Sequence, residues 1–147
     1  MNEVLDLPQT REYQRMPYAG FWIRVGAALI DSIIVGVVNF AIAKAFIPGY
    51  AFMETNWPAT AVSLITGIAY YVVMESSEKQ GTLGKMALNL KVGKANGERI
   101  SFANALGRYF AKYISAMILF IGYMMVGWDD KKQGLHDKIA NTYVFEA

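Results

Sequence analysis

The stretch from Gly20 to Lys44, GFWIRVGAALIDSIIVGVVNFAIAK, constrains the fold more than any other part of the chain. Between Arg24 and Lys44 its only strongly polar side chains are Asp31 and Asn39. Twenty helical residues give roughly 30 Å, which is the thickness of the hydrocarbon layer of a bilayer. The stretch therefore predicts a membrane-spanning helix, with Arg24 and Lys44 reaching opposite interfaces.

A second apolar stretch, ATAVSLITGIAYYVVM, follows Pro58 and ends before Glu75. Proline suits the first position of a helix, and aromatic side chains stand at both rims, with Trp57 at one and Tyr70 and Tyr71 near the other. The composition agrees with a membrane protein, because 54% of the residues are hydrophobic and only 18% are charged. We therefore predict a second spanning helix here.

Basic residues give the chain an orientation. Several lie between positions 75 and 101 or after Trp128, whereas the 45–57 connection has neither Lys nor Arg. Because basic loops stay on the cytoplasmic side, we predict that the 76–101 loop and the 130–147 tail are cytoplasmic. The N-terminal lead-in, residues 1–17, then lies on the same side.

The third apolar region, Phe102 to Trp128, is too long for one untilted span and too short for two full ones. A cytoplasmic tail requires this region to enter the membrane and return. We predict two short membrane helices that do so, with Gly122 and Gly127 as places to bend. The alternative is one long tilted helix with the tail outside.

Residues with small side chains recur at four-residue spacing in both predicted spans. Such ladders allow two helix backbones to approach closely in lipid, so we expect the two spans to pack along them. The ladders are Ala28, Ser32 and Gly36 in the first span and Ala59, Ser63 and Gly67 in the second.

The segment LNLKVGKANGERIS, residues 88–101, differs from the apolar stretches around it. Its Asn96-Gly97 pair is typical of a type I′ turn between two short antiparallel strands. The β-branched and aromatic residues of Thr142–Phe145 fit a third strand.

Together these patterns predict an all-α membrane protein with a small cytoplasmic β-hairpin element. The architecture is a small polytopic helical bundle of two full spans plus a short helix pair or re-entrant hairpin. Residues 18–147 form one domain, with helices near 20–46, 58–75, 102–117 and 120–129.

Arg24 and Asp31 lie two helical turns apart on one face of the first span, with Asp31 about 10 Å deeper. A carboxylate at that depth costs on the order of 3 kcal/mol in lipid, so it should face protein or water. Arg108 and Lys112, one turn apart in the third region, form a second face able to meet it. We hypothesise that Asp31 is neutralised by Arg24, Arg108 or Lys112.

His136 and Asp137 admit two interpretations. They could form a proton-handling pair, because histidine titrates near neutrality and intramembrane carboxylates relay protons. Alternatively, Asp137 accepts backbone N–H bonds while His136 packs, which we favour. No metal site is expected from a single histidine without cysteine, and no cofactor is indicated.

The GTLGKM stretch, from Gly81 to Met86, does not match a nucleotide-binding P-loop, which needs four residues between its glycines and Ser or Thr after the lysine. We predict that Thr82 caps a short interfacial helix. Five residues are expected to contact lipid head groups or the interface: Lys85, Lys91, Trp22, Trp57 and Trp128. The bilayer, in particular anionic lipid, is thus a predicted partner.

No Ser-His-Asp or Cys-His arrangement stands in a plausible order, so an enzyme is not expected. A formal charge of +2 gives no reason to expect nucleic acid as a partner.

Three stretches resemble the RDD family of small bacterial membrane proteins, named for one arginine and two aspartates. They are YAGFWIRVGAALID, GTLGKMALNLKV, and ALGRYFAKY followed by KKQGLHDKIANTYVF, in family order from Tyr18 to Phe145. Arg24 and Asp31 fill the first two named positions, and Asp137 the third. The resemblance implies a polytopic protein of the bacterial inner membrane, for which transport, including cation/proton exchange, has been proposed.

Two functions from different classes follow. In the first, transport of an unidentified small ligand or cation/proton exchange, Asp31 alternates between a protonated state and a state paired with a cation or an arginine, in a homo-oligomer that completes the pathway. In the second, a non-transporting scaffold or assembly factor, the Arg/Asp pairs are structural and fix the helix register.

Overall fold

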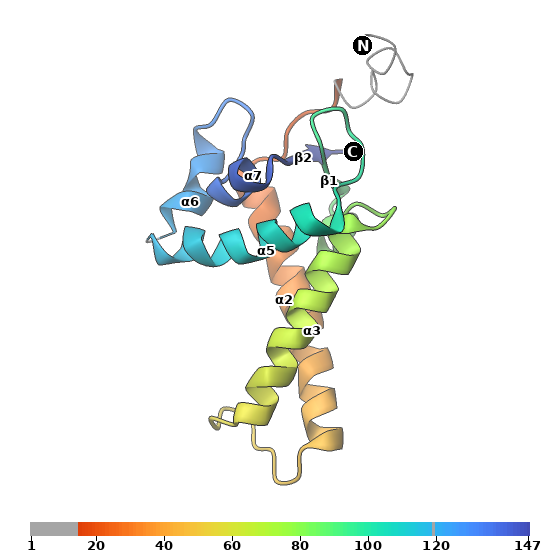
Figure 1. Cartoon of the computed structure of the whole chain (residues 1–147), viewed down its shortest axis with the longest axis vertical. Coiled ribbons are helices and arrows are strands. Elements are labelled where there is room, and N and C mark those ends of the chain that lie inside the picture. Colours follow the sequence, from red (N-terminus) through yellow and green to blue (C-terminus); the bar gives the residue numbers. More distant parts are fainter. Residues whose placement is uncertain (1–14, 119) are drawn as a thin grey trace.

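A long helical hairpin dominates the computed structural model, which describes residues 15–118 and 120–147. Residues 1–14 of the predicted lead-in lie outside the described residues. Helices α2 (Phe21–Phe46) and α3 (Trp57–Ser76) run side by side and are joined by the 47–56 loop (Figure 1). Both are long and apolar enough to cross a membrane, and in each only 11% of an apolar stretch of 18 residues is buried. Residues 21–76 are called the hairpin below.

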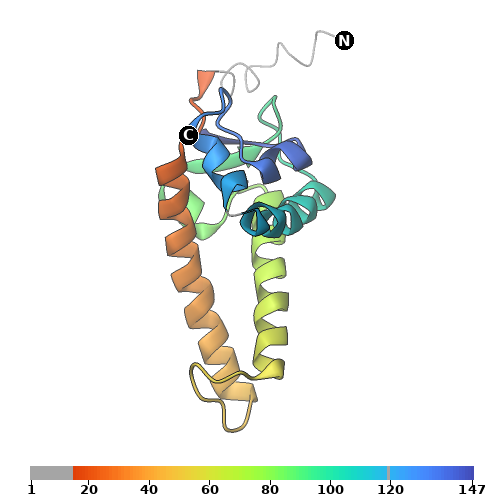
Figure 2. The same ribbon diagram turned by 90° about the vertical axis from the view of Figure 1, so that its left-hand side faces the viewer.

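The rest of the described chain gathers at the open end of the hairpin and is called the head, residues 77–147. Figure 2 shows the same arrangement from the side, with α2 and α3 extending from the head. The fold is mostly helical with a small antiparallel sheet, as predicted. The head contains α4 (Leu83–Ala87), β1 (Leu90–Gly93), α5 (Phe102–Met117), α6 (Ile121–Met124), the 3-10 helix η2 (Met125–Gly127), α7 (Leu135–Ala140) and β2 (Tyr143–Glu146).

The sheet pairs β1 with β2, with Leu90 opposite Glu146. The predicted hairpin partner, residues 98–101, is not a strand, and the suggested third strand takes its place. Gln80 supplies the reason, since its backbone oxygen accepts from the Val92 N–H at 2.6 Å and its side-chain amide donates to the Val92 oxygen at 3.2 Å. The edge of β1 that the predicted strand would have used is therefore already hydrogen-bonded.

The two ladders of small residues do not face each other, contrary to expectation. Ala28, Ser32 and Gly36 are exposed on α2, and a methyl group added at Gly36 would meet nothing within 4 Å. Gly67 on α3 is buried, but against α5, because an added methyl would lie 3.0 Å from the Tyr109 hydroxyl. The close approach is between α3 and α5.

The third apolar region is broken, and its two parts are bent by 114° relative to each other, which rules out the single straight helix. The break comes at Phe120, which has a left-handed φ of 61°. Gly122 serves packing rather than bending, because an added methyl would come within 2.7 Å of Ser115. In both Figure 1 and Figure 2, α5 lies across the long axis of the hairpin rather than along it.

Candidate functional site

Asp137 at the start of α7 lies at the centre of a buried charge network. Its carboxylate receives Arg24 Nη1 at 2.5 Å and also binds Arg108 Nη1. Asp137 is fully buried and Arg108 is 1% exposed. Burial alone would raise the pKa of Asp137, but Arg108, His136 and Arg24 outweigh it and hold this pKa well below its usual range. The carboxylate is therefore ionised at neutral pH.

Arg24 reaches this network because the sheet fixes the segment before α2. The Ala19 N–H donates to the Val144 oxygen of β2 at 2.9 Å, and Arg24 Nε donates back to the Ala19 oxygen at 3.0 Å. Its third nitrogen donates to the backbone oxygen of Lys132. One guanidinium thus joins α2 to the sheet, to the loop before α7 and to α7 itself.

Glu75 at the end of α3 joins the network and was not among the predicted site residues. The second span was expected simply to end before Glu75, yet Glu75 is 1% exposed. It accepts from Arg108 Nε at 3.0 Å, forms an ion pair with Lys85, and lies 3.5 Å from Lys112 Nζ. The position of this acidic residue directly after an apolar span was the feature of the sequence that could have indicated its place in the network.

In this network, positively and negatively charged side chains alternate, and their ion pairs connect α2, α3, α4, α5 and α7. Among the described residues its cations outnumber its anions, with Arg24, Lys85, Arg108 and Lys112 against Glu75 and Asp137. Every carboxylate in it already has at least two donors. Chemically, such a network holds elements together, and a ligand cation would have to displace a bound guanidinium or ammonium group.

Asp31 is buried but lacks the cationic partner that we hypothesised. Within residues 15–118 and 120–147, no ion pair includes it. Its oxygens accept instead from the hydroxyls of Tyr70 at 2.7 Å and Thr82 at 2.5 Å, and from the Gly84 N–H at 2.8 Å. The expected pairing of Asp31 with a cation is wrong because α4 packs directly on α2, and its neutral donors occupy the positions around the carboxylate that a cation would need.

The GTLGK turn makes this packing possible. Thr82 caps α4, as predicted, by accepting from the Lys85 N–H at 3.4 Å. A methyl group at Gly84 would lie 2.2 Å from the Ala27 oxygen and 2.8 Å from the Asp31 carboxyl group, so only glycine allows this approach. The motif therefore brings the Thr82 hydroxyl and the Gly84 N–H to Asp31.

His136 and Asp137 are neighbours in space as well as in sequence, with Nε2 3.5 Å from Oδ1. Burial lowers the pKa of His136 to about 3 against the opposing effect of Asp137, so the imidazole is neutral at pH 7. Asp137 also accepts from the Gly134 N–H at 3.0 Å, and the His136 ring packs 5.2 Å from that of Tyr123. This geometry matches the favoured interpretation of capping and packing.

The residues predicted to contact lipid fall into two groups. Lys85 is a correction: it is 9% exposed and its ammonium group binds Glu75, so head groups do not reach it. Lys91 lies in β1 and is half-buried. The tryptophans are exposed, with Trp22 and Trp57 both at 79% and Trp128 at 63%.

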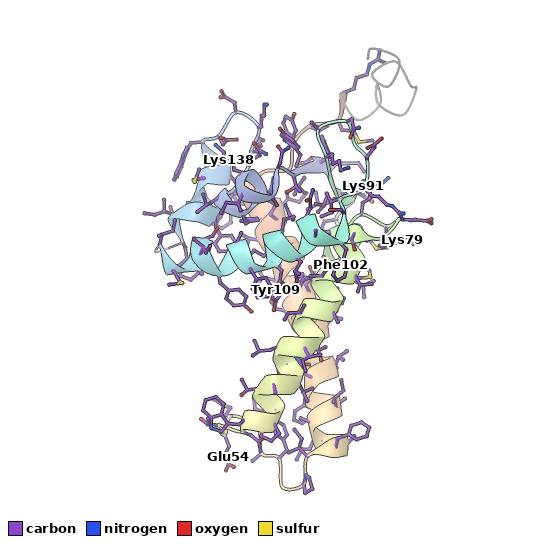
Figure 3. The ribbon with its side chains drawn as sticks, in the orientation of Figure 1. Glu54, Lys79, Lys91, Phe102, Tyr109 and Lys138 are labelled. Carbon is purple, nitrogen blue, oxygen red and sulfur yellow. The ribbon has the colours of Figure 1, made fainter. Side chains whose placement is uncertain are left out.

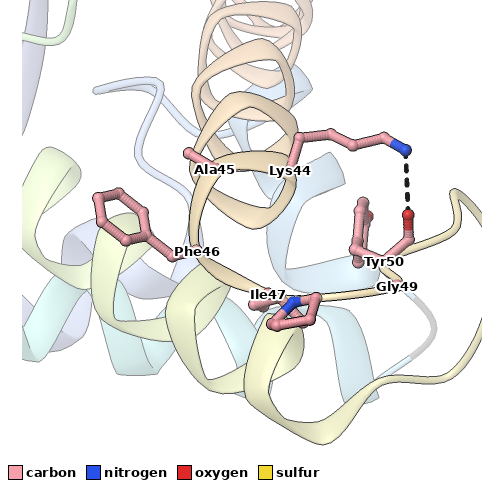
Figure 4. Close-up of a pocket in the computed structure, with 7 residues that line it drawn as sticks. Lys44, Ala45, Phe46, Ile47, Gly49 and Tyr50 are labelled. Carbon is pink, nitrogen blue, oxygen red and sulfur yellow. Dashed lines mark hydrogen bonds between the residues drawn. The ribbon is translucent and has the colours of Figure 1, made fainter.

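A pocket of about 270 Å³ lies at the opposite end of the hairpin, between Lys44 and Tyr50 (Figure 4). Lys44 Nζ donates to the backbone oxygen of Tyr50 at 3.1 Å, and both residues line the pocket. None of the predicted site residues lines it. Among the residues that the structure describes, no cluster of three His, Asp or Glu side chains could hold a metal ion.

Comparisons with known proteins agree with the motifs. The sequence model described as the RDD family matches residues 18–141. A Bacillus subtilis (strain 168) protein named uncharacterized protein YxaI is 38% identical over 145 residues, covering 86% of this chain and 95% of its own. The uncharacterized membrane protein YteJ of the same strain is 33% identical, covering 93% and 86%.

A partial match is the proline-rich antigen homolog of Mycobacterium tuberculosis (strain CDC 1551 / Oshkosh). It is 37% identical over 83 residues, which is 53% of this chain and 34% of that protein. No solved structure matches this chain.

Proposed function

The chain belongs to the RDD family, and we propose that it is a non-enzymatic membrane scaffold rather than a transporter. In this proposal the three residues of the family's name fasten the head to the hairpin. Arg24 and Asp137 join α2 to α7, and Asp31 joins α2 to α4. The exposed faces of the hairpin then serve to contact other membrane components.

The observation that carries the proposal is the complete enclosure of Asp31. It is 1% exposed, and neutral donors occupy both of its oxygens. A transport site needs a carboxylate that water or a cation can reach, whereas a buried and fully hydrogen-bonded carboxylate specifies geometry. Transport through this residue is therefore the weaker hypothesis.

The charge distribution supports a bacterial inner-membrane protein that crosses twice, with both termini in the cytoplasm. Figure 3 shows Lys79, Lys91 and Lys138 in the head, at the opposite end of the molecule from Glu54 in the 47–56 loop. Basic residues stay cytoplasmic, which places the head inside and the loop outside. The same residues suit anionic lipid as a partner of the head.

A flux assay separates the two hypotheses. Purified protein would be reconstituted into vesicles, and movement of H⁺, Na⁺ and K⁺ followed under imposed gradients. A scaffold gives the rates of protein-free vesicles. The scaffold proposal would be refuted by a flux that Asp31→Asn abolishes, while the variant stays folded, and that Asp130→Asn leaves intact. Asp130 is the control because it is exposed.

The first partner to test is a second copy of the chain, the homo-oligomer expected from the sequence. Ile33, 68% exposed on α2, points away from the fold. Because the chain has no cysteine, Ile33→Cys provides a single site for cross-linking in native membranes. Dimers joined at this position would support self-association through α2. Monomers alone would direct the search to other membrane proteins.

A further inference from the structure

Helix α5 has its polarity reversed relative to a helix of a soluble protein. The side that packs against the rest of the fold carries mostly small residues and one charge, namely Ala105, Arg108, Ala111 and Ser115, together with Tyr109. The opposite side exposes large apolar side chains: Phe102, Phe110, Ile114 and Met117 are between 49% and 80% exposed. An exposed apolar surface of this kind requires an apolar environment.

The apolar face of α5 borders the hairpin, because α5 packs on α3 through Tyr109 and Gly67. Beyond the break, Ile121 and Met124 of α6 are also 49% exposed, but the α6–η2 segment is bent by 114° relative to α5 and rises toward α7 in Figure 1. The apolar face next to the hairpin is therefore that of α5.

The level at which α5 crosses α3 can be placed along the membrane normal. Arg108 of α5 binds Glu75, which follows Trp57 by 18 helical residues, or about 27 Å. With Trp57 at one interface, the crossing comes close to the other, since the hydrocarbon layer is about 30 Å thick. Figure 1 shows α5 running across the hairpin axis at this level.

We propose that α5 lies in the plane of the membrane as an amphipathic belt, with its exposed apolar face in the acyl chains of the leaflet next to the head. The belt does not cross the bilayer. It differs from the two short membrane helices predicted from the sequence, and it leaves α2 and α3 as the spans. The inference is independent of the scaffold proposal, because a transporter could carry the same belt.

The test uses spin labels on the full-length protein, which contains no cysteine of its own. Four single-cysteine variants carry the label on the belt: Phe102→Cys, Phe110→Cys, Ile114→Cys and Met117→Cys. The variants Leu29→Cys and Val37→Cys carry it on the exposed side of α2 as controls. After reconstitution into phosphatidylcholine and phosphatidylglycerol vesicles, power saturation with oxygen and a nickel chelate gives the depth of each label.

We expect all four belt labels at a similar depth, about 5–10 Å below the head groups. The α2 controls should differ by about 12 Å, because eight residues separate them along a spanning helix. A depth that changes steadily from Phe102 to Met117, by up to about 22 Å, would show a crossing helix and overturn the proposal. Labels that behave as in water would overturn it as well.

A second measurement has an independent outcome. A membrane-impermeant thiol reagent is applied to vesicles of known protein orientation carrying Lys79→Cys, Glu54→Cys or Ala147→Cys. The belt predicts that positions 79 and 147 react from the same side and position 54 from the other. Reaction of positions 79 and 147 from opposite sides would mean that the third region crosses, which contradicts the belt.

Discussion

Arg24 and Asp137 lie 113 positions apart in the sequence, and the guanidinium of the first donates to the carboxylate of the second at 2.5 Å. The contact joins the first turn of α2 to the first turn of α7. Arg108 binds the other oxygen of the same carboxylate from α5. Three helices that are remote in sequence therefore meet at one buried anion, and several predictions depend on it.

Removing the charge of Asp137 should destabilise the head. Asp137→Asn leaves the buried Arg108 and the partly buried Arg24 without their shared anion, and breaking a buried pair in this way costs about 3–5 kcal/mol. The free energy of unfolding can be measured in mixed micelles as SDS is added, with tryptophan fluorescence as the readout. Asp130→Asn, in an exposed position, is the matched control and should change little. Equal stability of the two variants would contradict the network.

Asp31→Asn should cost less, about 1–3 kcal/mol in the same assay. The asparagine retains one acceptor oxygen for Tyr70 or Gly84 but turns an amide donor toward the others. No cation is left unpaired, because Asp31 has no ion pair in the described part of the chain. If Asp31→Asn proved as damaging as Asp137→Asn, a cationic partner of Asp31 would have to exist after all.

A positive charge alone should not reproduce the stabilising effect of Arg24. Its guanidinium donates to Ala19, Asp137 and Lys132 in three directions, whereas a lysine ammonium is a compact charge that cannot reach all three acceptors. We expect Arg24→Lys to lose roughly 1–3 kcal/mol of unfolding free energy. The exposed Arg99→Lys serves as the comparison. A fully stable Arg24→Lys would mean that only the charge matters.

The pH dependence of stability should contain a contribution from His136. Its pKa falls to about 3 in the fold and is near 6.5 when unfolded, so between these values the unfolded chain binds the extra proton. Stability should therefore fall as the pH is lowered from 6.5 toward 3, by up to about 1.4 kcal/mol per unit from this group. His136→Phe preserves the ring packing on Tyr123 and should reduce that slope between pH 4.5 and 6. An unchanged slope would show that the histidine is not buried as neutral imidazole.

Local patterns in the sequence were sufficient to predict the two long helices and the membrane class. The apolar stretches beginning near Gly20 and Pro58 became α2 and α3, because lipid requires long apolar helices whatever else the chain does. The cap at Thr82 was equally predictable, since it depends on residues within one turn.

Pairing between remote segments was not predictable in the same way. The sequence identified Arg24, Asp31 and Asp137 but gave no means of deciding which would meet. That choice depends on α4, whose neutral donors enclose Asp31 and leave Arg24 for Asp137. Likewise, β1 pairs with β2 rather than with its sequence neighbour because Gln80 occupies its other edge.

The last prediction concerns Gly84, which lets α4 reach Asp31. In Gly84→Ala the added methyl carbon would lie 2.2 Å from the Ala27 backbone oxygen, so the two would overlap. The methyl carbon is attached to the backbone of α4 and the oxygen belongs to the backbone of α2, so neither can move aside easily. We expect the free energy of unfolding to fall by about 1–3 kcal/mol or more because of overpacking, and α4 to separate from α2. Gly36→Ala is the matched control, because nothing lies within 4 Å of its added methyl.

Two readouts distinguish local release from general unfolding. Amide hydrogen exchange should rise in residues 82–87 of Gly84→Ala while the far end of the hairpin stays protected, since Thr82 and Gly84 bind Asp31 near the head end of α2. Unchanged exchange and unchanged stability would show that the glycine is not required for this approach. If Gly36→Ala were the more damaging substitution, the exposed face of α2 would have to be packed against another chain in the membrane.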